Sequence, residues 1–506
     1  MKVLLTAINA KYIHSNLAVY SLRAYAEKYA QHTEIAEYTI NQTMDDILSD
    51  IYKKKPDVLC LSCYLWNILY VEQLITEIHK VLPDLQIWLG GPEVSYNAVS
   101  MMERYPQVTG VMCGEGEETF LELMEHWLGE GNDLCMIRGI VYRKEGACIQ
   151  NEARPVMDLS KVPFVYDHIE DFQNKIIYYE SSRGCPFSCS YCLSSIDKCL
   201  RFRDLELVKR ELQFFIDHEV PQVKFVDRTF NCKHSHSMAI WTYLKEHDKG
   251  KTNFHFEVAA DLLNEEELEL IASMRPGLIQ LEIGIQSTNP ETITEIHRKM
   301  NFEEVKRVVK RVQEKENVHQ HLDLIAGLPY EDYHTFAKSF RDVYALHPEQ
   351  LQLGFLKVLK GSYMHDKAAE YELLYQDRPP FEVLSTKWLS YDDVIRLKGV
   401  EEMVEVYYNS GQFVNTLHLL EEAFPDTFAL YESLSRYYEE HDLHMMNHSR
   451  MTRYEVLFAF IKAHVENDVD NYRQMLILDL YLRENVKKRP EFAGEIQIEK
   501  REASAF

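Results

Sequence analysis

The feature that most constrains the fold is a repeated alternation of predicted strands and helices over residues 172–362. Short apolar runs predict the strands, and the stretches between them have the spacing of amphipathic helices. Six such units in succession predict a barrel or partial barrel with its active site at the carboxyl ends of the strands. The six predicted strands are residues 176–181, 223–227, 254–260, 279–287, 322–328 and 351–359.

A shorter alternation of the same kind precedes the barrel. It predicts a Rossmann-like, doubly wound parallel sheet, in which ligands bind at the carboxyl ends of the strands. The fold class is therefore α/β for both parts. The predicted strands of this first sheet are residues 2–8, 57–64, 86–91 and 110–114, and the predicted helices cover 17–30, 71–81 and 114–127.

The remaining segments complete a four-part organisation. Residues 137–171 are expected to form a linker that begins with a hairpin pattern and continues with a proline-containing stretch. Residues 363–506 lack the strand–helix alternation and have helical spacing, which predicts an α-helical C-terminal domain. The expected boundaries are thus 1–136 for the Rossmann-like domain and 172–362 for a partial (β/α)6 TIM-type barrel.

The charge and hydropathy of the chain exclude several partners. The formal net charge is -25, which disfavours binding to nucleic acid or to an anionic membrane surface. No stretch approaches about 18 uninterrupted apolar residues, so no transmembrane helix is expected. The apolar run after Lys2 is too short for a signal peptide and is a better first strand. We therefore expect a cytoplasmic protein with no nucleic acid and no membrane partner.

Three of the ten cysteines are closely spaced and follow the first predicted barrel strand. Cys185, Cys189 and Cys192 form a C-x3-C-x2-C pattern. In a reducing compartment clustered cysteines are typical metal ligands, and three thiolates within one loop can bind three irons of a cubane cluster. A zinc site usually has two C-x2-C pairs. Cys199 is a candidate fourth ligand, but the simpler prediction is a 4Fe–4S cluster with one iron open to substrate.

The segment from Cys185 to about Leu359 resembles the core of the radical-SAM superfamily. The resemblance implies that the open iron binds the amino and carboxylate groups of S-adenosylmethionine (SAM). It also implies that the reduced cluster injects one electron into the sulfonium, which yields methionine and a 5′-deoxyadenosyl radical. An external electron donor such as flavodoxin or ferredoxin is then expected.

The resemblance also assigns residues that contact SAM. Tyr191 precedes the third cysteine and is expected near the adenine. Asp227 in KFVDRTFN is expected near the methionine amino group, and Glu257 in FHFEVAA is expected to face the ribose. Gln286 and Ser287 in EIGIQS are expected near SAM. For buried polar residues such as Glu257 and Gln286, a satisfied position in the core is the alternative.

Two further motifs extend the resemblance along the barrel. LDLIAGLPYE at 322–331 matches the fifth-strand pattern, and LGFLKVLKG at 353–361 matches the sixth-strand adenine platform. Each motif is short, and their common order along the chain carries the resemblance. The C-terminal region resembles an uncharacterised helical extension found in one branch of the family.

The first domain resembles the cobalamin-binding domain of cobalamin-dependent radical-SAM enzymes. Three loops after predicted strands, LSCYL, WLGGPEVS and CGEGEETF, carry this resemblance. Glycines in such loops let the backbone approach a bulky ligand. A flavodoxin-like domain that binds a nucleotide or no ligand is the alternative. The resemblance assigns cobalamin contacts to Ser62, Gly90, Gly91, Gly114 and Gly116.

His14 is a weaker candidate in the same domain. Cobalamin proteins that replace the lower axial base carry D-x-H-x-x-G after the first strand, whereas this chain has NAKYIHSNLA at 9–18. His14 lies near the required place, but the Asp and the Gly are missing. An orienting partner is usual for a ligating histidine, so an ordinary loop histidine is the alternative. The resemblance implies cobalamin binding without a protein histidine.

These features predict a cobalamin-dependent radical-SAM methyltransferase that acts on an unreactive carbon or phosphorus of a small-molecule or natural-product substrate. A non-methylating enzyme of rearrangement or cyclisation, with cobalamin as redox partner, needs the same two sites. A third hypothesis is a cobalamin- or redox-sensing regulatory protein with a structural cluster. No motif in the sequence identifies the substrate.

Overall fold

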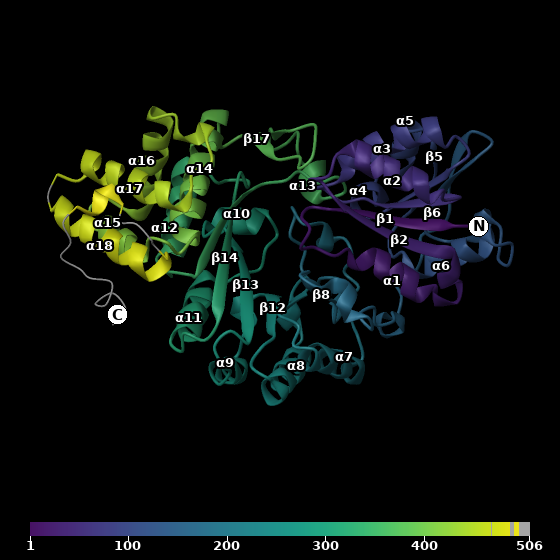
Figure 1. Ribbon diagram of the computed structural model, residues 1–506, viewed down its shortest axis with the longest axis horizontal. Coiled ribbons are helices and arrows are strands. Elements are labelled where there is room, and N and C mark those ends of the chain that lie inside the picture. Colours follow the sequence, from purple (N-terminus) through teal and green to yellow (C-terminus); the bar gives the residue numbers. More distant parts are fainter. Residues whose placement is uncertain (467, 486–489, 495–506) are drawn as a thin grey trace.

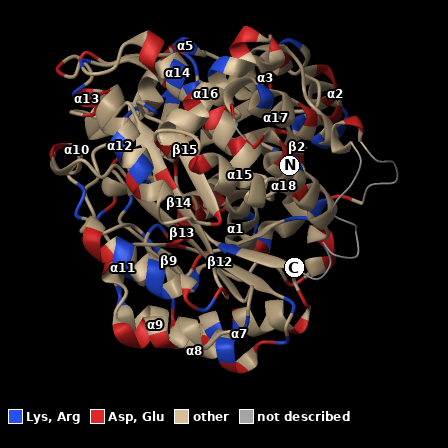
Figure 2. Ribbon diagram, turned by 90° about the vertical axis from the view of Figure 1, so that its left-hand side faces the viewer, with Lys and Arg blue, Asp and Glu red and all other residues tan. Residues whose placement is uncertain are grey.

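The structure is a computed structural model that describes residues 1–466, 468–485 and 490–494. Three parts follow one another along the longest axis of the molecule (Figure 1). A sheet with helices on both faces is N-terminal, a half-open barrel is central, and a group of helices is C-terminal. In the view of Figure 2, Lys and Arg positions are interspersed with Asp and Glu positions. Within the described residues, no helix has the length and apolar character needed to cross a bilayer.

The N-terminal sheet has seven strands in the order β2-β1-β3-β4-β5-β6-β7. The first five are parallel, and β6 and β7 add an antiparallel hairpin. All seven residues of β1 are buried, as expected for the centre of a sheet covered on both faces. The strands are β1 (Val3–Asn9), β2 (Thr33–Thr39), β3 (Val58–Ser62), β4 (Gln86–Gly90), β5 (Val108–Met112), β6 (Ile140–Lys144) and β7 (Ala147–Gln150).

Helices cover both faces of this sheet (Figure 1). The doubly wound sheet predicted from the sequence is therefore confirmed. Strand β2 and helix α2 were absent from the sequence-based prediction. The helices are α1 (Leu17–Tyr25), α2 (Met44–Lys54), α3 (Ile68–Val81), α4 (Pro92–Ser95), α5 (Ala98–Arg104) and α6 (Glu117–Trp127).

The hairpin predicted at the start of the linker joins the N-terminal sheet. Met112 of β5 pairs with Ile140 of β6, so the hairpin extends the hydrogen-bond ladder of the sheet. Val141 and Tyr142 are buried against the two sides of this sheet. We propose on this basis that the first domain extends to Gln150, and that the connector is residues 151–171.

The barrel is a single sheet in the order β15-β14-β13-β12-β11-β8, with every pair of neighbours parallel. The partial barrel and its six strands are therefore confirmed. The strands are β8 (Ile177–Tyr179), β11 (Gln222–Phe225), β12 (Asn253–Val258), β13 (Ile279–Gln286), β14 (His319–Ala326) and β15 (Gln350–Phe355). The helices of this part are α7 (Leu205–Asp217), α8 (His234–His247), α9 (Glu265–Ala272), α10 (Pro290–Glu295), α11 (Phe302–Gln313), α12 (Tyr333–Tyr344) and α13 (Tyr363–Asp366).

The carboxyl edge of the N-terminal sheet contacts both sides of the open barrel. At the β8 side, the Ile176 amide donates to the Ile13 carbonyl at 2.7 Å. At the β15 side, the ring of Tyr96 packs on Gly361, where an added Cβ would lie 2.8 Å from the ring. The segments that follow β1 and α4 therefore contact the barrel near its two edge strands, and Figure 1 shows the N-terminal domain beside the barrel.

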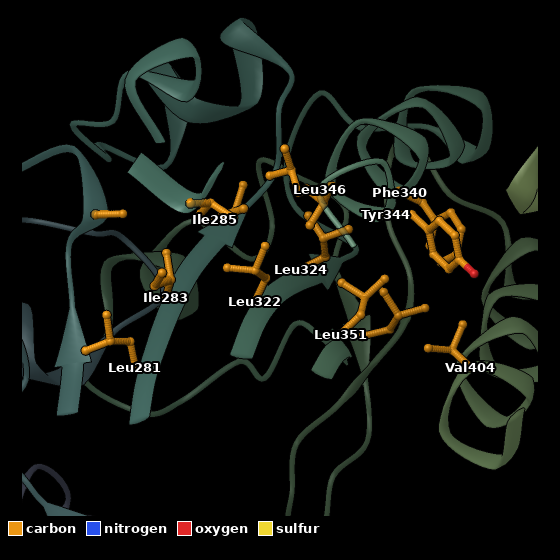
Figure 3. Close-up of a cluster of buried hydrophobic side chains, with 14 of the residues drawn as sticks. Leu281, Ile283, Ile285, Leu322, Leu324, Phe340, Tyr344, Leu346, Leu351 and Val404 are labelled. Atoms are coloured by element: carbon orange, nitrogen blue, oxygen red, sulfur yellow. The ribbon is translucent and has the colours of Figure 1, made fainter. Parts of the chain in front are cut away.

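The C-terminal part is mainly helical, as predicted, and shares one hydrophobic core with the barrel. Figure 3 shows this core running from β13 and β14 through Phe340 and Tyr344 of α12 to Val404. The predicted domain 363–506 extends over residues 495–506, which lie outside the described residues. The elements are β16 (Leu374–Tyr375), β17 (Val383–Ser385), α14 (Tyr391–Met403), a π-helical turn (Val404–Asn409), α15 (Val414–Glu421), α16 (Thr427–Glu440), α17 (Arg450–His464) and α18 (Val469–Arg483).

The π-helical turn places one side chain against the free edge of the barrel. The Asn409 amide group accepts from the Leu351 N–H at 2.9 Å and donates to the Leu351 carbonyl at 2.8 Å. An edge strand otherwise leaves such groups without a strand partner. Asn409 therefore completes the hydrogen bonding of β15 as a neighbouring strand would.

Replacing this asparagine tests the edge contact. Asn409→Ala leaves two backbone groups of β15 without a protein partner, which costs about 1–3 kcal/mol for a buried group. We expect faster amide hydrogen exchange in residues 350–355. Asn415→Ala, which removes a hydrogen bond to Asp479 within the C-terminal helices, is expected to leave that exchange unchanged. Equal exchange of 350–355 in both variants would contradict the assignment.

Candidate functional site

The cysteine loop begins and ends at a short two-stranded ribbon beside the barrel. Strand β9 (Ser182–Arg183) follows β8 and pairs antiparallel with β10 (Arg201–Phe202). Residues 184–200 therefore form a closed loop at the carboxyl end of the first barrel strand. Gly184 has a φ of 93°, and an added Cβ would lie 2.8 Å from the Cys199 carbonyl oxygen. Only glycine fits where the loop leaves the ribbon.

The three sulfur atoms lie in one partly buried region. Cys185 and Cys189 are buried and Cys192 is half-buried. The pKa of the Cys185 thiol is raised by burial, and the nearby Cys192 and Cys189 sulfurs add to that increase. Among the described residues, no three His, Cys, Asp or Glu side chains converge on a single metal ion. In a cubane each thiolate binds a different iron, so three neighbouring sulfurs supply the ligands of a cluster with one open iron.

The backbone of the loop is tied to two other barrel segments. The Ser190 N–H donates to the Ile296 carbonyl at 2.9 Å, and the Ser190 carbonyl accepts from Met364 N–H at 2.9 Å. These bonds hold the middle of the loop between the turn after α10 and the turn at α13. The cysteine positions are thus set by packing against the barrel as well as by the ribbon.

Asp227 lies below the start of this loop and is fully buried. Its carboxylate accepts from the Ser181 N–H at 2.9 Å, from the Ser181 hydroxyl at 2.7 Å and from the Ser182 hydroxyl at 2.6 Å. Burial raises the pKa of Asp227 to about 6, and these hydrogen bonds oppose the increase. The geometry supports an anchoring role for Asp227. A direct contact with the SAM amino group stays a prediction.

The side chain of Gln286 lies over Gly284 on β13. Gln286 has a φ of 73°, which is uncommon for a residue with a side chain. Its Oε1 atom is buried and has no hydrogen-bond partner among the described residues. At Gly284 an added Cβ would lie 2.3 Å from Gln286 Nε2. An orphaned amide oxygen above a glycine fits a bound ligand with a hydrogen-bond donor, as the SAM prediction requires.

Ser287, by contrast, is directed into the protein. It is fully buried, and its hydroxyl donates to Glu331 Oε1 at 2.6 Å. Ser339 donates to the same oxygen at 2.8 Å, while Glu331 Oε2 has no hydrogen-bond partner in the described part of the chain. Burial raises the pKa of Glu331 to about 7. The structure supports a role for Ser287 in holding Glu331, and its contact with SAM stays a prediction.

Arg298 joins three parts of the site and was missed from the sequence. Its guanidinium lies 3.8 Å from the Cys189 sulfur and donates to the Tyr191 hydroxyl at 3.3 Å and to the Gly284 carbonyl. A buried cation beside a cysteine favours the thiolate that binds iron. Arg298 is 109 positions from Cys189, so no local spacing in the sequence could indicate the contact.

The inner face of the barrel is polar. Along β13, buried apolar residues alternate with half-buried positions that include Gln280, Glu282 and Gln286. Glu282 accepts from Lys224 Nζ at 2.9 Å and lies 3.0 Å from His255 Nε2. Burial alone would raise the pKa of Glu282, but the neighbouring His255 and Lys224 side chains lower it to about 2. The sequence-based prediction missed this charged pair.

Glu257, a predicted SAM contact, lies on the same inner face. It is the direct strand partner of Glu282 in the β12–β13 ladder. Burial raises the pKa of Glu257 to about 7, while the charge of Arg228 opposes the increase. Asp323 and His321, 3.1 Å apart on β14, continue this face. The interior of the barrel therefore holds several ionisable groups.

The predicted cobalamin residues lie at the carboxyl edge of the N-terminal sheet. Ser62 accepts from Asn16 Nδ2 at 3.1 Å and is half-buried. Gly91 is required by internal packing, because an added Cβ would lie 2.4 Å from the Cys63 carbonyl oxygen. Gly114, with a φ of 80°, has no atom within 4 Å of such a Cβ. Open space at this edge fits a bulky ligand.

Gly90 and Gly116 also lie at this edge, with side chains of the sheet and its helices beside them. An added Cβ at Gly90 would lie 3.4 Å from Met112 Cε, and one at Gly116 would lie 2.9 Å from Leu22 Cδ2. Packing within the domain explains the small residue at Gly116. Cobalamin contacts at all five predicted positions stay predictions.

His14 faces the barrel through its ring nitrogen. Its Nδ1 lies 2.6 Å from the Tyr178 hydroxyl of β8. Burial lowers the pKa of His14, and Lys11 and Lys224 add to the decrease. Tyr12, Trp66 and Tyr96 at the same edge are 68%, 44% and 47% exposed. Exposed aromatic side chains fit a large, partly apolar ligand such as a corrin, and ligation of cobalt by His14 stays a prediction.

Three family models match the chain in succession. Residues 3–124 match the B12 binding domain, and residues 179–343 match the radical SAM superfamily. Residues 369–506 match a protein family of unknown function, DUF4080. The first two matches cover the two parts whose facing edges form the site.

Curated relatives and a solved structure are similar to most of the chain. A 2-(S-pantetheinyl)-carbapenam-3-carboxylate methyltransferase of Streptantibioticus cattleyicolor is 26% identical over 76% of this chain and 61% of its own length. The cobalamin-dependent radical SAM methyltransferase TokK of Streptomyces tokunonensis is 26% identical over 64% of this chain and 51% of its own. The chain thus spans less than two thirds of either relative. The structure of OxsB with aqua-cobalamin and SAM bound matches this chain with a TM-score of 0.63 and 16% sequence identity. The match covers 95% of this chain and 79% of the OxsB chain.

Substitution of single cysteines tests the cluster site. Cys185→Ala, Cys189→Ala and Cys192→Ala each remove one thiolate ligand of the predicted cluster. We expect each variant to lose most of the iron and sulfide bound after anaerobic reconstitution, as measured by chemical analysis and the visible spectrum. Cys199→Ala, which removes an exposed thiol of the same loop, is the control and should keep both. Iron loss in that control instead would make Cys199 a ligand.

The buried carboxyl of Glu331 predicts a dependence of stability on pH. Its folded-state pKa is raised from 4.5 to about 7. The stability it contributes is therefore complete below about pH 4.5 and is lost as pH rises through about 7. In wild type, the free energy of unfolding should therefore fall by at most about 1.4 kcal/mol per pH unit because of this group. Glu331→Gln is uncharged at every pH and should lack that fall. The measurement is urea unfolding at a series of pH values.

The control for this measurement is Glu303→Gln, an exposed residue paired with Lys306 on α11. It should keep the wild-type pH dependence. If wild type and Glu331→Gln have the same slope between about pH 5 and pH 7, Glu331 is not the group that titrates.

Proposed function

We propose that this chain, in which residues 3–124 match the B12 binding domain and residues 179–343 match the radical SAM superfamily, is a cobalamin-dependent radical SAM methyltransferase. The proposed substrate is a small molecule with an unreactive carbon or phosphorus centre. One observation carries the proposal: the carboxyl edge of the N-terminal sheet lies against the open side of the barrel, next to the cysteine loop. Two cofactors bound at these edges would face a common space, as transfer of a methyl group requires.

The residues present fit each of the three groups. Cys185, Cys189 and Cys192 would hold a 4Fe–4S cluster, and the orphaned oxygen of Gln286 would accept a hydrogen bond from SAM. The open position at Gly114 would receive part of cobalamin. When bound, the cluster with SAM supplies a radical that removes hydrogen, and cobalamin supplies a carrier for the methyl group.

The side chains of the barrel prepare the space between these sites. Arg298 balances the negative charge of the cysteine loop, and Lys224 balances Glu282, which also lies 3.0 Å from His255 Nε2. Glu257 forms no ion pair within the described residues, and its pKa of about 7 lets it hold or release a proton near neutral pH. We propose that Glu257 hydrogen-bonds SAM or substrate and that the balanced pairs keep the inner face from carrying a large net charge.

We also propose an electron donor for the cluster and a reducing compartment for the protein. A radical SAM protein needs an electron donor, and a flavodoxin or ferredoxin is proposed for this role. All ten cysteines are free, which agrees with a reducing compartment such as the cytoplasm. Both curated relatives are methyltransferases by name, which supports this activity. Because this chain spans less than two thirds of either relative, we do not transfer their substrates to it.

The test is anaerobic incubation of the reconstituted protein with cobalamin, a reductant, methyl-labelled SAM and a panel of small molecules. We expect 5′-deoxyadenosine together with a product heavier by one labelled methyl group, both detected by mass spectrometry. Glu257→Gln keeps the shape of the side chain without its charge and is expected to lower the rate at least tenfold, because it cannot exchange a proton. Glu303→Gln is the surface control.

Two outcomes would contradict the proposal. A product that lacks the label and has lost hydrogen would indicate rearrangement or cyclisation. Protein that carries the cluster and is reduced, yet leaves SAM intact, would indicate a regulatory protein with a structural cluster.

A further inference from the structure

The ribbon at the base of the cysteine loop has two arginines directly opposite each other. Arg183 on β9 and Arg201 on β10 are partners in the antiparallel register. Arg183 is two residues before Cys185, and Arg201 is two residues after Cys199. Like charges at facing positions of a ribbon destabilise it unless nearby anions compensate. The closed form of the loop therefore depends on carboxylates that reach both arginines.

One carboxylate from the N-terminal domain reaches both. Glu115 Oε1 accepts from Arg183 Nη1 at 2.8 Å and from Arg201 Nη2 at 2.5 Å. Its other oxygen, Oε2, accepts from the Met157 N–H at 2.8 Å. Although burial alone would raise the pKa of Glu115, Arg201, the Met157 N–H and Arg183 lower it, so the side chain is a carboxylate at neutral pH. Glu115 thus lies across the base of the loop.

Further carboxylates complete this ionic cluster. Glu117 Oε1, also from the N-terminal domain, accepts from Arg183 Nη2 at 2.8 Å. Glu180 binds Arg183 through both oxygens, at 2.8 and 2.7 Å, and Asp197 binds Arg201 at 3.0 Å. Glu180 and Asp197 belong to the barrel part of the chain, whereas Glu115 and Glu117 reach across from the other domain. The bridge between the two domains therefore rests on Glu115 and Glu117.

The position of these two glutamates links the bridge to the other cofactor site. Glu115 lies between Gly114 and Gly116, which are predicted cobalamin contacts, and Gly114 borders open space. A ligand bound at Gly114 would bear directly on the peptide that carries the Glu115 carboxylate. The same short segment thus contacts the cysteine loop on one side and the proposed cobalamin space on the other.

We propose that Glu115 is a positioning residue that couples the two cofactor sites. It holds the base of the cysteine loop closed, and its own backbone is held by cobalamin, so that each cofactor binds more tightly when the other is present. The coupling is reciprocal by thermodynamic necessity. This inference rests on the proposed function for its ligands, while the bridge itself is a property of the chain without cofactors.

The first measurement is amide hydrogen exchange of the full chain without cofactors. Glu115→Gln removes the charge shared by the two arginines and keeps the size of the side chain. We expect faster exchange in peptides spanning residues 183–202. Glu125→Gln is the matched control, because Glu125 is in the adjoining helix α6 and pairs at 2.7 Å with Lys28 of the same domain. Unchanged exchange of residues 183–202 in Glu115→Gln would overturn the bridge.

The second measurement is the affinity for hydroxocobalamin of the chain with and without its reconstituted cluster. For wild type and Glu125→Gln we expect about tenfold tighter binding when the cluster is present, within the usual range of coupling between sites. For Glu115→Gln the ratio should fall toward one. If Glu115 were only structural, Glu115→Gln would change the affinity for hydroxocobalamin equally with and without the cluster. The ratio of the two affinities would then stay at its wild-type value.

Two further variants keep the test decisive if Glu115→Gln folds poorly. Glu117→Gln removes only one of the three carboxylates around Arg183 and should give a smaller change of the same sign. Glu115→Asp keeps the carboxylate on a shorter side chain and should keep part of the wild-type ratio. A wild-type ratio of one would overturn the coupling. Failure of wild type to bind cobalamin in either form would overturn the proposed function, and the exchange measurement would still decide the bridge.

Discussion

Parallel hydrogen-bond ladders in two separate sheets determine where the site can lie. In a parallel sheet every strand ends at the same edge, and the loops that follow the strands collect there. The barrel strands β8 to β15 bring the cysteine loop, Gln286 and the Glu331 turn to one edge. The strands of the N-terminal sheet bring His14, Ser62, Gly91 and Gly114 to another. The function follows from how these two edges are held together.

The contacts that hold the edges together are local and chemically varied. A backbone hydrogen bond joins Ile176 to Ile13, an aromatic ring packs on Gly361, and Glu115 bridges two arginines. On the opposite side, Asn409 completes the hydrogen bonding of the last barrel strand. The N-terminal domain therefore contacts the half-open barrel at both of its edges, and the C-terminal helices contact it at the β15 edge as well. This gives the helical part a physical role in maintaining the barrel.

The sequence predicted the elements of the fold better than the roles of single side chains. The six barrel strands were recognised because their apolar residues pack against helices in a regular pattern. Strand β2 was missed because it is an edge strand in which Glu34 and Glu37 interrupt the apolar pattern. The hairpin of residues 140–150 was recognised as such, but sequence alone could not show that it pairs with β5.

Within the site, local motifs predicted where the candidate residues lie. Their hydrogen-bond and ionic partners are contributed by segments distant in the sequence. Asp227 and Ser287 occupy the strand ends expected from the motifs, yet their hydrogen bonds are made to Ser181, Ser182 and Glu331 inside the protein. Arg298 and Glu115 act on segments 109 and 86 positions away. No pattern of neighbouring residues records such contacts, because they depend on how separate loops meet after folding.

We propose that one chain holds an iron–sulfur cluster and a corrin at facing edges at the same time. The most direct measurement is the content of iron and cobalt per chain after anaerobic reconstitution with both cofactors and removal of unbound metal. A cubane cluster and one cobalamin predict about four irons and about one cobalt in the same monodisperse protein. Binding of only one of the two metals, or loss of one when the other is added, would contradict the account.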